Sequence, residues 1–181
     1  MKSILILTII MFSFFSSSKA QINKTAYDFT FTDIDGKDVK LDKFNNKVIV
    51  VVNVASRCGF TYQYEGLQKL WDNYEDKGLV VIGVPTNNFK QEPGSNKEIK
   101  DFCENNFGIT FPITAKVNVI GSEAHPFYKW AKESHGISAI PKWNFHKIII
   151  DKKGHVSKAF SSITKPSSSK FISYINKKIK N

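Results

Sequence analysis

Residues 51–70 read VVNVASRCGFTYQYEGLQKL: an apolar run, then a single cysteine, Cys58, and then a helical pattern. The run begins at Lys47, and its β-branched residues alternate little with polar ones, which is typical of a central strand covered on both faces. Apolar side chains recur at helical spacing from Leu67 to Tyr74, and Gly78 ends the predicted helix. A buried strand followed by a helix indicates an α/β protein.

The rest of the sequence continues the alternation of strands and helices. Ser95 and Glu98 have the spacing of a capping box, which predicts a second helix that begins there and continues to Asn106. The other predicted elements are a first strand at 27–32, a strand at 79–84 ended by Pro85, a helix at 124–134, a hairpin of strands at 147–151 and 155–160, and a last amphipathic helix at 167–179. This order predicts a central mixed β-sheet flanked by helices on both faces.

The first twenty residues, MKSILILTIIMFSFFSSSKA, differ from the rest of the chain. Lys2 gives a positive start, residues 4–15 are almost wholly apolar, and small residues end the segment at Ala20. This layout predicts a signal peptide at 1–20 that is cleaved after Ala20, and therefore an exported protein, periplasmic or secreted. The apolar stretch is too short to span a bilayer core of about 30 Å, so we expect no stable membrane insertion after cleavage. An uncleaved anchor is the alternative.

The remaining residues, 21–181, have the size of a single domain with its own core. The whole chain carries a formal net charge of +10, yet its lysines are scattered, and only the C-terminal segment 177–180 forms a dense basic run. A nucleic-acid-binding surface would gather its charge on one face, so we expect no nucleic-acid partner.

Cys58 lies between the end of a buried strand and the start of a helix, where open α/β sheets place their active sites. The neighbouring Arg57 and the N-terminal amides of the helix both favour the thiolate, which is the reactive form. Three interpretations stay open at this point: a small core residue, one half of a structural disulfide with Cys103, or a nucleophile. Two cysteines in an exported chain ordinarily indicate a disulfide, but a domain of this size does not need one to fold.

Other cysteine and metal chemistries lack their motifs. Thr61 and Tyr62 stand where the second cysteine of a CxxC disulfide exchanger or a CxxxC copper carrier would follow Cys58. The four histidines show no tight ligand spacing, and no phosphate-binding glycine loop is visible. We therefore expect neither a metal nor a cofactor.

Three separated blocks, NVASRCG, QEPGSN and KWNF, occur in this order along the chain. On these blocks the chain resembles the glutathione peroxidase family, and most of all its cysteine-containing, thioredoxin-dependent members. The resemblance extends from about Ala26 to the last helix and implies a thioredoxin-like fold for residues 21–181. Because the segment 118–143 lacks the longer insertion of tetrameric relatives, it also implies a monomer.

The resemblance implies a role for each matching residue. Cys58 matches the peroxidatic position, and Gln91, Trp143 and Asn144 match the other members of the catalytic tetrad. Cys103 matches the resolving cysteine of the thioredoxin-dependent branch. These residue types suit peroxide reduction, because a thiolate attacks one oxygen while neutral N–H donors stabilise the charge that develops on the other. The resulting sulfenic acid condenses with a second thiol to give a disulfide.

The sequence departs from the family pattern just before Gln91. Relatives read P-C-N-Q-F-G there, whereas residues 85–90 of this chain read PTNNFK. Thr86 replaces the cysteine of that pattern, which leaves Cys103 as the only thiol that can resolve Cys58 within the chain. The glycine of the pattern is missing between Phe89 and Lys90, so the loop that leads to Gln91 is one residue shorter than in relatives.

These features predict a thiol peroxidase for defence against oxidative stress. Its substrates would be hydrogen peroxide and organic or lipid hydroperoxides, and its reductant a thioredoxin-like protein or glutathione. Two other classes remain as alternatives. A non-enzymatic binding or redox-sensing module would use Cys58–Cys103 as a permanent structural disulfide, and a disulfide exchanger or copper carrier would need the motifs that this chain lacks.

Overall fold

The computed structural model describes residues 24–181, so the predicted signal peptide at 1–20 lies outside the described residues. Within 24–181, no helix combines the length and the apolar character needed to cross a membrane. The elements follow one another as η1 Ala26–Asp28, β1 Thr30–Thr32, β2 Asp38–Lys40, η2 Leu41–Phe44, β3 Val48–Val54, α1 Gln63–Tyr74, η3 Glu75–Lys77, β4 Leu79–Pro85, α2 Asn96–Phe107, α3 Pro126–His135, η4 Gly136–Ala139, β5 Lys147–Ile150, β6 Val156–Phe160 and α4 Ser169–Lys180.

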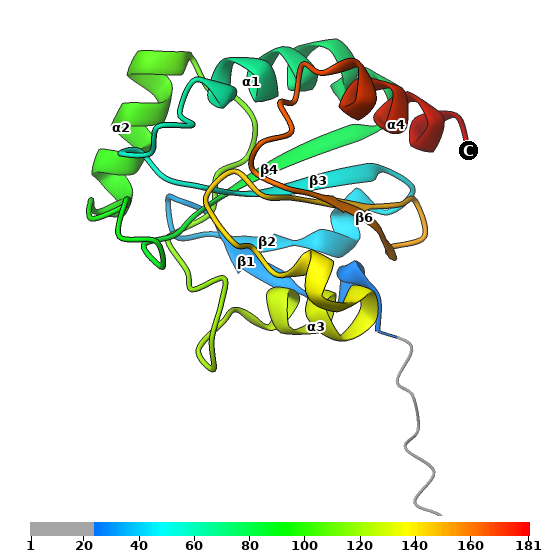
Figure 1. The fold of residues 1–181 in the computed structure, drawn as a ribbon, viewed down its shortest axis with the longest axis horizontal. Coiled ribbons are helices and arrows are strands. Elements are labelled where there is room, and N and C mark those ends of the chain that lie inside the picture. The colour runs from blue at the N-terminus through cyan, green and yellow to red at the C-terminus, as the bar shows by residue number, and fades with distance from the viewer. Residues whose placement is uncertain (1–23) are drawn as a thin grey trace, which may run out of the picture.

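The central sheet has four strands in the order β4-β3-β5-β6 (Figure 1). β3 lies parallel to β4 and antiparallel to β5, and β5 and β6 form an antiparallel hairpin. β3 is therefore an interior strand, and all 7 of its residues are buried, as its β-branched run predicts. The predicted mixed α/β sheet is confirmed.

Two hydrophobic clusters lie on the two faces of this sheet. On one face, α1, α2 and α4 pack against strand residues such as Val50 and Val81. On the other, α3 and the small β1-β2 hairpin pack against Val51 and Ile82 (Figure 1). Successive residues of a strand point to opposite faces, which is why Val50 and Val51 belong to different clusters. Helices thus cover both faces, as predicted.

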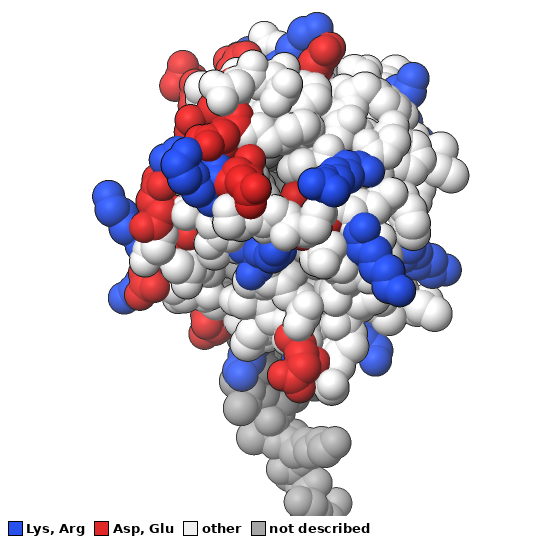
Figure 2. Space-filling model, turned by 90° about the vertical axis from the view of Figure 1, so that its left-hand side faces the viewer, with Lys and Arg blue, Asp and Glu red and all other residues white. Residues whose placement is uncertain are grey.

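The outward side of α2 is charged. Lys97 pairs with Asp101 at 2.6 Å along the helix, and Lys100 pairs with Asp35 of the β1-β2 turn at 2.8 Å. On the side of the molecule where α2 lies, acidic side chains gather on one half of the surface, whereas lysines and arginines occur on both (Figure 2). Such exposed pairs contribute little to stability, so α2 is held mainly by its buried side.

The prediction of the first strand is wrong for the first half of its range. Alternation predicts a strand at 27–32, but Ala26–Asp28 forms a 3-10 turn and β1 covers only Thr30–Thr32. The Asp28 carboxylate accepts a 2.7 Å hydrogen bond from the Thr25 backbone N–H, and this local contact favours a turn over an extended chain. The other predicted strands and the last three helices begin and end within two residues of their predicted positions.

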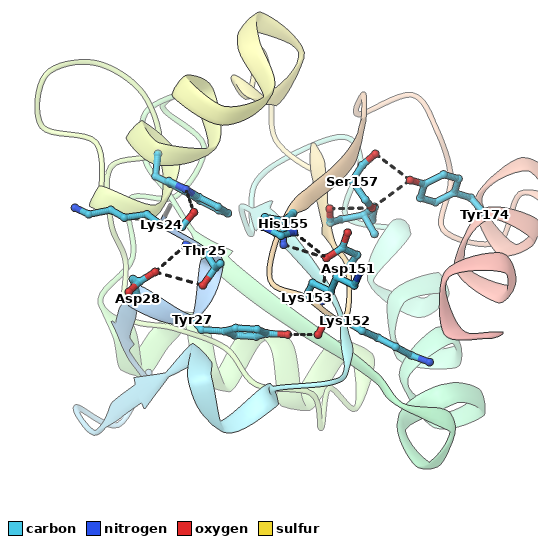
Figure 3. A network of polar contacts seen from close by, with 12 residues as sticks. Lys24, Thr25, Tyr27, Asp28, Asp151, Lys152, Lys153, His155, Ser157 and Tyr174 are labelled. Carbon is cyan, nitrogen blue, oxygen red and sulfur yellow. Dashed lines mark hydrogen bonds and ion pairs between the residues drawn. The ribbon is translucent and has the colours of Figure 1, made fainter. Parts of the chain in front are cut away.

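The start of the described chain is attached to the β5-β6 turn, at the end of the sheet opposite Cys58. The Ala26 N–H donates to the Gly154 carbonyl across 2.8 Å, and the Tyr27 hydroxyl donates to the Lys152 carbonyl across 2.9 Å (Figure 3). Gly154 has φ +82°, and a Cβ there would lie 2.8 Å from the Tyr27 ring. This turn therefore requires glycine.

Candidate active site

Cys58 lies in a turn that follows the carboxyl end of β3. It is only 4% exposed, and the Phe60 backbone N–H donates to its Sγ atom across 3.4 Å. The Thr61 N–H closes the turn on the Cys58 carbonyl at 3.1 Å, and α1 begins only at Gln63. Sequence analysis expects the thiol directly before a helix. The turn lies between the two, so the N–H that reaches the sulfur comes from the turn.

Gln91 connects the Cys58 turn to the segment that precedes β5. Its backbone carbonyl accepts a 3.0 Å hydrogen bond from the N–H of Arg57. Its side-chain oxygen Oε1 accepts a 2.9 Å hydrogen bond from Asn144 Nδ2. Asn144 is fully buried, and its Oδ1 atom has no partner within residues 24–181. The fold therefore brings Gln91 and Asn144 together beside the Cys58 turn.

Trp143 lies at the surface of the same region. It is 41% exposed, and its ring centroid lies 5.4 Å from that of Phe89. Its carbonyl accepts a 3.1 Å hydrogen bond from Asn53 Nδ2, and the Phe145 N–H donates to the Asn53 carbonyl across 2.6 Å. Asn53 thus fixes the backbone on both sides of Asn144 to β3. Sequence analysis does not single out Asn53, although one amide inside an apolar strand is a signal that could have found it.

The loop before Gln91 turns at Lys90. Lys90 has φ +58°, a left-handed conformation that costs energy for any residue with a Cβ, and its N–H donates to the Asn87 carbonyl across 2.9 Å. Directly after this turn, the Gln91 side chain meets Asn144.

A buried carboxylate lies next to Gln91. Glu92 is 1% exposed and accepts hydrogen bonds from the backbone N–H of Ser56 at 2.7 Å and from its hydroxyl at 3.0 Å. Burial raises the pKa of Glu92, while these hydrogen bonds and the charges of Lys116 and Arg57 oppose the shift. Sequence analysis does not identify Glu92, because an acidic loop residue ordinarily faces water. Its contacts hold the Gln91 loop against the end of β3.

Cys103 lies on the sheet-facing side of α2. It is fully buried, and both cysteines of the chain are free thiols. Burial raises the pKa of the Cys103 thiol to about 11. In this conformation Cys103 is therefore a neutral thiol inside the hydrophobic core.

A buried lysine lies below the first turn of α1. Lys147 Nζ donates to the Gln63 side-chain oxygen and to the Thr164 carbonyl, the latter at 2.7 Å, and Gln63 Nε2 donates to the Ser162 carbonyl across 2.7 Å. Burial lowers the pKa of Lys147 to about 7. The network joins β5, the loop after β6 and the helix that follows Cys58, and sequence analysis does not detect it.

The groups gathered around the Cys58 turn suit chemistry on an oxygen atom. Amide and indole N–H groups are neutral donors that can stabilise negative charge as it develops. Within residues 24–181, no group of three or more His, Cys, Asp or Glu side chains is arranged to hold a metal ion.

Comparison with known families shows to which protein family this arrangement of residues belongs. Residues 26–132 match the family model described as glutathione peroxidase. The chain belongs to the glutathione peroxidase family. As a member of that family it is a peroxidase, an enzyme of the oxidoreductase class, which confirms the family and enzyme class predicted from the sequence.

Curated relatives of this glutathione peroxidase family member share close to half of their aligned residues with it. The hydroperoxy fatty acid reductase gpx1 of Synechocystis sp. is 46% identical over 156 residues, which cover 81% of this chain and 92% of the relative. The glutathione peroxidase-like peroxiredoxin 2 of Saccharomyces cerevisiae is 48% identical over 147 residues, which cover 78% of this chain and 90% of the relative.

Solved structures agree with the fold. The crystal structure of Trgpx in its apo form matches with a TM-score of 0.71 and 34% identity, covering 88% of this chain and 97% of that one. A thiol:disulfide interchange protein of the thioredoxin family from Chlorobium tepidum matches with a TM-score of 0.62 at 16% identity, covering 83% and 92% of the two chains. This second likeness concerns the fold alone. The thioredoxin-like fold predicted for the domain is confirmed.

Proposed function

We propose that this peroxidase reduces hydrogen peroxide and organic or lipid hydroperoxides through Cys58, in defence against oxidative stress. The observation that carries the proposal is the contact of Gln91 with Asn144, because the Gln91 backbone is bonded to Arg57 and these neutral amides therefore lie beside the turn that carries the Cys58 thiol. We assign Cys58 as the nucleophile and Gln91, Trp143 and Asn144 as the donors. A relative named hydroperoxy fatty acid reductase fits the lipid substrates.

The first step transfers one oxygen atom to sulfur. The Cys58 thiolate attacks the terminal oxygen of R–O–O–H, the O–O bond breaks, and R–O⁻ leaves and takes up a proton to become the alcohol, or water when R is hydrogen. Cys58 is oxidised to the sulfenic acid while the peroxide accepts two electrons. Donors aimed at the departing oxygen stabilise its charge and lower the barrier.

The second step joins Cys58 and Cys103 in a disulfide and releases the sulfenic oxygen as water. Disulfide-linked Cα atoms lie within about 7 Å of each other. Because Cys103 is buried on α2, we expect this helix to unwind locally before the two sulfur atoms meet. A thioredoxin-like dithiol or two glutathione molecules then restore both thiols. The relatives named peroxiredoxins fit a thioredoxin-like reductant.

The protein would act as a monomer after export. The pattern of residues 1–20 supports export, and cleavage after Ala20 would leave Gln21 as the first residue. N-terminal sequencing of protein recovered from outside the cytoplasm checks the site of cleavage, and light scattering checks the monomer. A chain recovered with its apolar segment still attached would indicate the uncleaved anchor.

Peroxide turnover coupled to NADPH oxidation tests the proposed cycle, once with thioredoxin and its reductase and once with glutathione and its reductase. Cys58→Ser should abolish turnover with both reductants. Cys103→Ser should lose thioredoxin-supported cycling but still undergo one stoichiometric oxidation. Full turnover by Cys58→Ser would overturn the assignment of the nucleophile. A wild-type melting temperature that collapses on reduction, without peroxide consumption, would favour a structural disulfide instead.

A further inference from the structure

We propose that Tyr64 is a positioning residue for the second step of this cycle: its buried hydroxyl donates a hydrogen bond to the Cys103 sulfur as that thiol loses its proton to react with oxidised Cys58. The inference rests on the proposed peroxidase function and adds a residue to it. Tyr64 lies in the first turn of α1, and the proposal gives its side chain no role in the first step.

The Tyr64 hydroxyl is buried without a conventional partner. The residue is fully buried, and within residues 24–181 no atom meets the geometry of a hydrogen bond to its oxygen. Tyr64 and Cys103 belong to the same buried cluster, and each group affects the other's pKa, although no hydrogen bond joins them. A buried hydroxyl in this situation costs free energy, which a role in the reaction would explain.

The ring of Tyr64 is held by aromatic side chains from both parts of the site. Its centroid lies 5.1 Å from that of Phe107 and 6.4 Å from that of Phe102, which flank Cys103 on α2. It lies 5.2 Å from the ring of Phe145, the residue that follows the Asn144 donor, in an edge-to-face arrangement. Contacts on these sides leave the ring little freedom. The Tyr64 ring is therefore held between α2 and the segment that carries Asn144.

Burial and the neighbouring acidic groups keep the Tyr64 hydroxyl protonated. Burial is the largest cause that raises the pKa of Tyr64 well above its usual value, and Cys103, Glu92 and Cys58 raise it further. Burial also raises the pKa of Cys103, to about 11, and Glu92 and Glu104 add to the shift, whereas the Tyr64 hydroxyl acts in the opposite direction and lowers it. Tyr64 is thus a neutral donor beside a thiol that resists losing its proton.

The bonds that break and form in the second step show at which atom such a donor acts. The S–H bond of Cys103 and the S–O bond of the Cys58 sulfenic acid break, the S–S bond forms, and the Cys103 proton leaves with the hydroxide as water. The thiolate is the attacking species. Tyr64 keeps its own proton throughout and stabilises the negative sulfur as it forms, before the opening of α2 brings that sulfur to Cys58.

Tyr64→Phe tests this inference, because it removes one oxygen atom and keeps the ring. Rapid mixing with peroxide, followed by trapping of sulfenic acid and of free thiols over a pH series, measures the two steps separately. We expect sulfenic acid to form at the wild-type rate. Disulfide formation should slow about tenfold or more near neutral pH, as expected for loss of a hydrogen bond to a charged group, and its pH profile should move to higher pH.

Tyr128→Phe is the matched control. Tyr128 also has a buried hydroxyl without a partner in the described chain, but it lies on α3, on the other face of the sheet. This variant should leave both steps unchanged. Wild-type disulfide formation in Tyr64→Phe, or an equal slowing of both steps, would overturn the inference. Failure of the proposed cycle would look different, since the wild-type protein itself would then form no disulfide after peroxide treatment.

Discussion

The Asn144 side chain donates a 2.9 Å hydrogen bond to the side-chain oxygen of Gln91, across 53 positions of sequence. The contact occupies the acceptor end of the Gln91 amide, so its NH2 group is the end left to donate to a substrate. A residue that only accepts hydrogen bonds at position 144 would reverse this arrangement.

Asn144→Asp should therefore slow the reaction with peroxide. The carboxylate can only accept, so the Gln91 amide would turn its NH2 group toward residue 144 and away from the peroxide, and loss of one such donor costs about 100-fold in rate. The added charge should also move the pH profile of the first step upward, because it opposes a second negative charge nearby. Rapid-mixing measurement of Cys58 oxidation checks both effects. Asn144→Ala should lose rate without the pH shift, and wild-type kinetics in Asn144→Asp would contradict the assignment.

Lys90→Gly should stabilise the protein. Lys90 has φ +58°, and relief of this left-handed strain is worth about 1 kcal/mol, partly offset by the greater freedom of glycine in the unfolded chain. Urea unfolding should show a higher midpoint with an unchanged slope. Lys90→Ala keeps the Cβ and serves as the control, which should show no gain. A gain of equal size in both variants would point to the lysine side chain instead of the backbone.

Lys147 should make the free energy of unfolding depend on pH above neutrality. Burial lowers its folded-state pKa to about 7, whereas an unfolded lysine titrates near about 10.4. Between these values the unfolded chain holds more protons, so stability rises with pH by up to about 1.4 kcal/mol per unit. Lys147→Met removes this difference. Urea unfolding at about pH 7, 8 and 9 should show that the free energy of unfolding of the wild-type protein rises relative to that of the variant. A difference that stays constant with pH would mean that Lys147 titrates normally.

Ser95→Ala should speed disulfide formation. Ser95 and Glu98 form a capping box at the start of α2, in which the Ser95 hydroxyl oxygen accepts a 3.3 Å hydrogen bond from the Glu98 backbone N–H. Loss of such a cap costs about 1 kcal/mol. If α2 opens before the sulfur atoms meet, the rate of disulfide formation should rise about fivefold. Thiol trapping after one addition of peroxide measures this rate.

Ser168→Ala controls for general destabilisation. Ser168 caps α4 in the same way, by accepting a 3.4 Å hydrogen bond from the Phe171 N–H. It should lower the melting temperature without faster disulfide formation. Equal acceleration by both variants would argue against a specific opening of α2.

The order of strands and helices follows from local patterns, because most elements carry their own apolar face. β3 is the clearest case, since its β-branched run predicts a buried strand and all 7 residues are buried. The first strand shows the limit of this reasoning. The contact of Thr25 with Asp28 favours a turn where alternation alone predicts an extended chain.

The site depends on contacts that no local pattern contains. Family resemblance supplies Gln91 and Asn144, but their hydrogen bond depends on the Lys90 turn and on the backbone that Asn53 holds. Glu92 escapes prediction because its burial depends on Ser56, 36 positions away. Side chains of this kind normally face water, so only the assembled fold shows which of them are buried and paired.

The buried surface of α2 has a consequence for amide hydrogen exchange. Only Ile99 and Cys103 of its 12 residues are buried, whereas β3 is hydrogen-bonded to a strand on each side. Amides of α2 should exchange through brief local openings, and those of β3 only when the whole domain unfolds. Cys58 thus follows a strand whose amides should exchange slowly, and Cys103 lies on a helix whose amides should exchange fast. The protein can therefore move the Cys103 thiol while the Cys58 thiol stays in place.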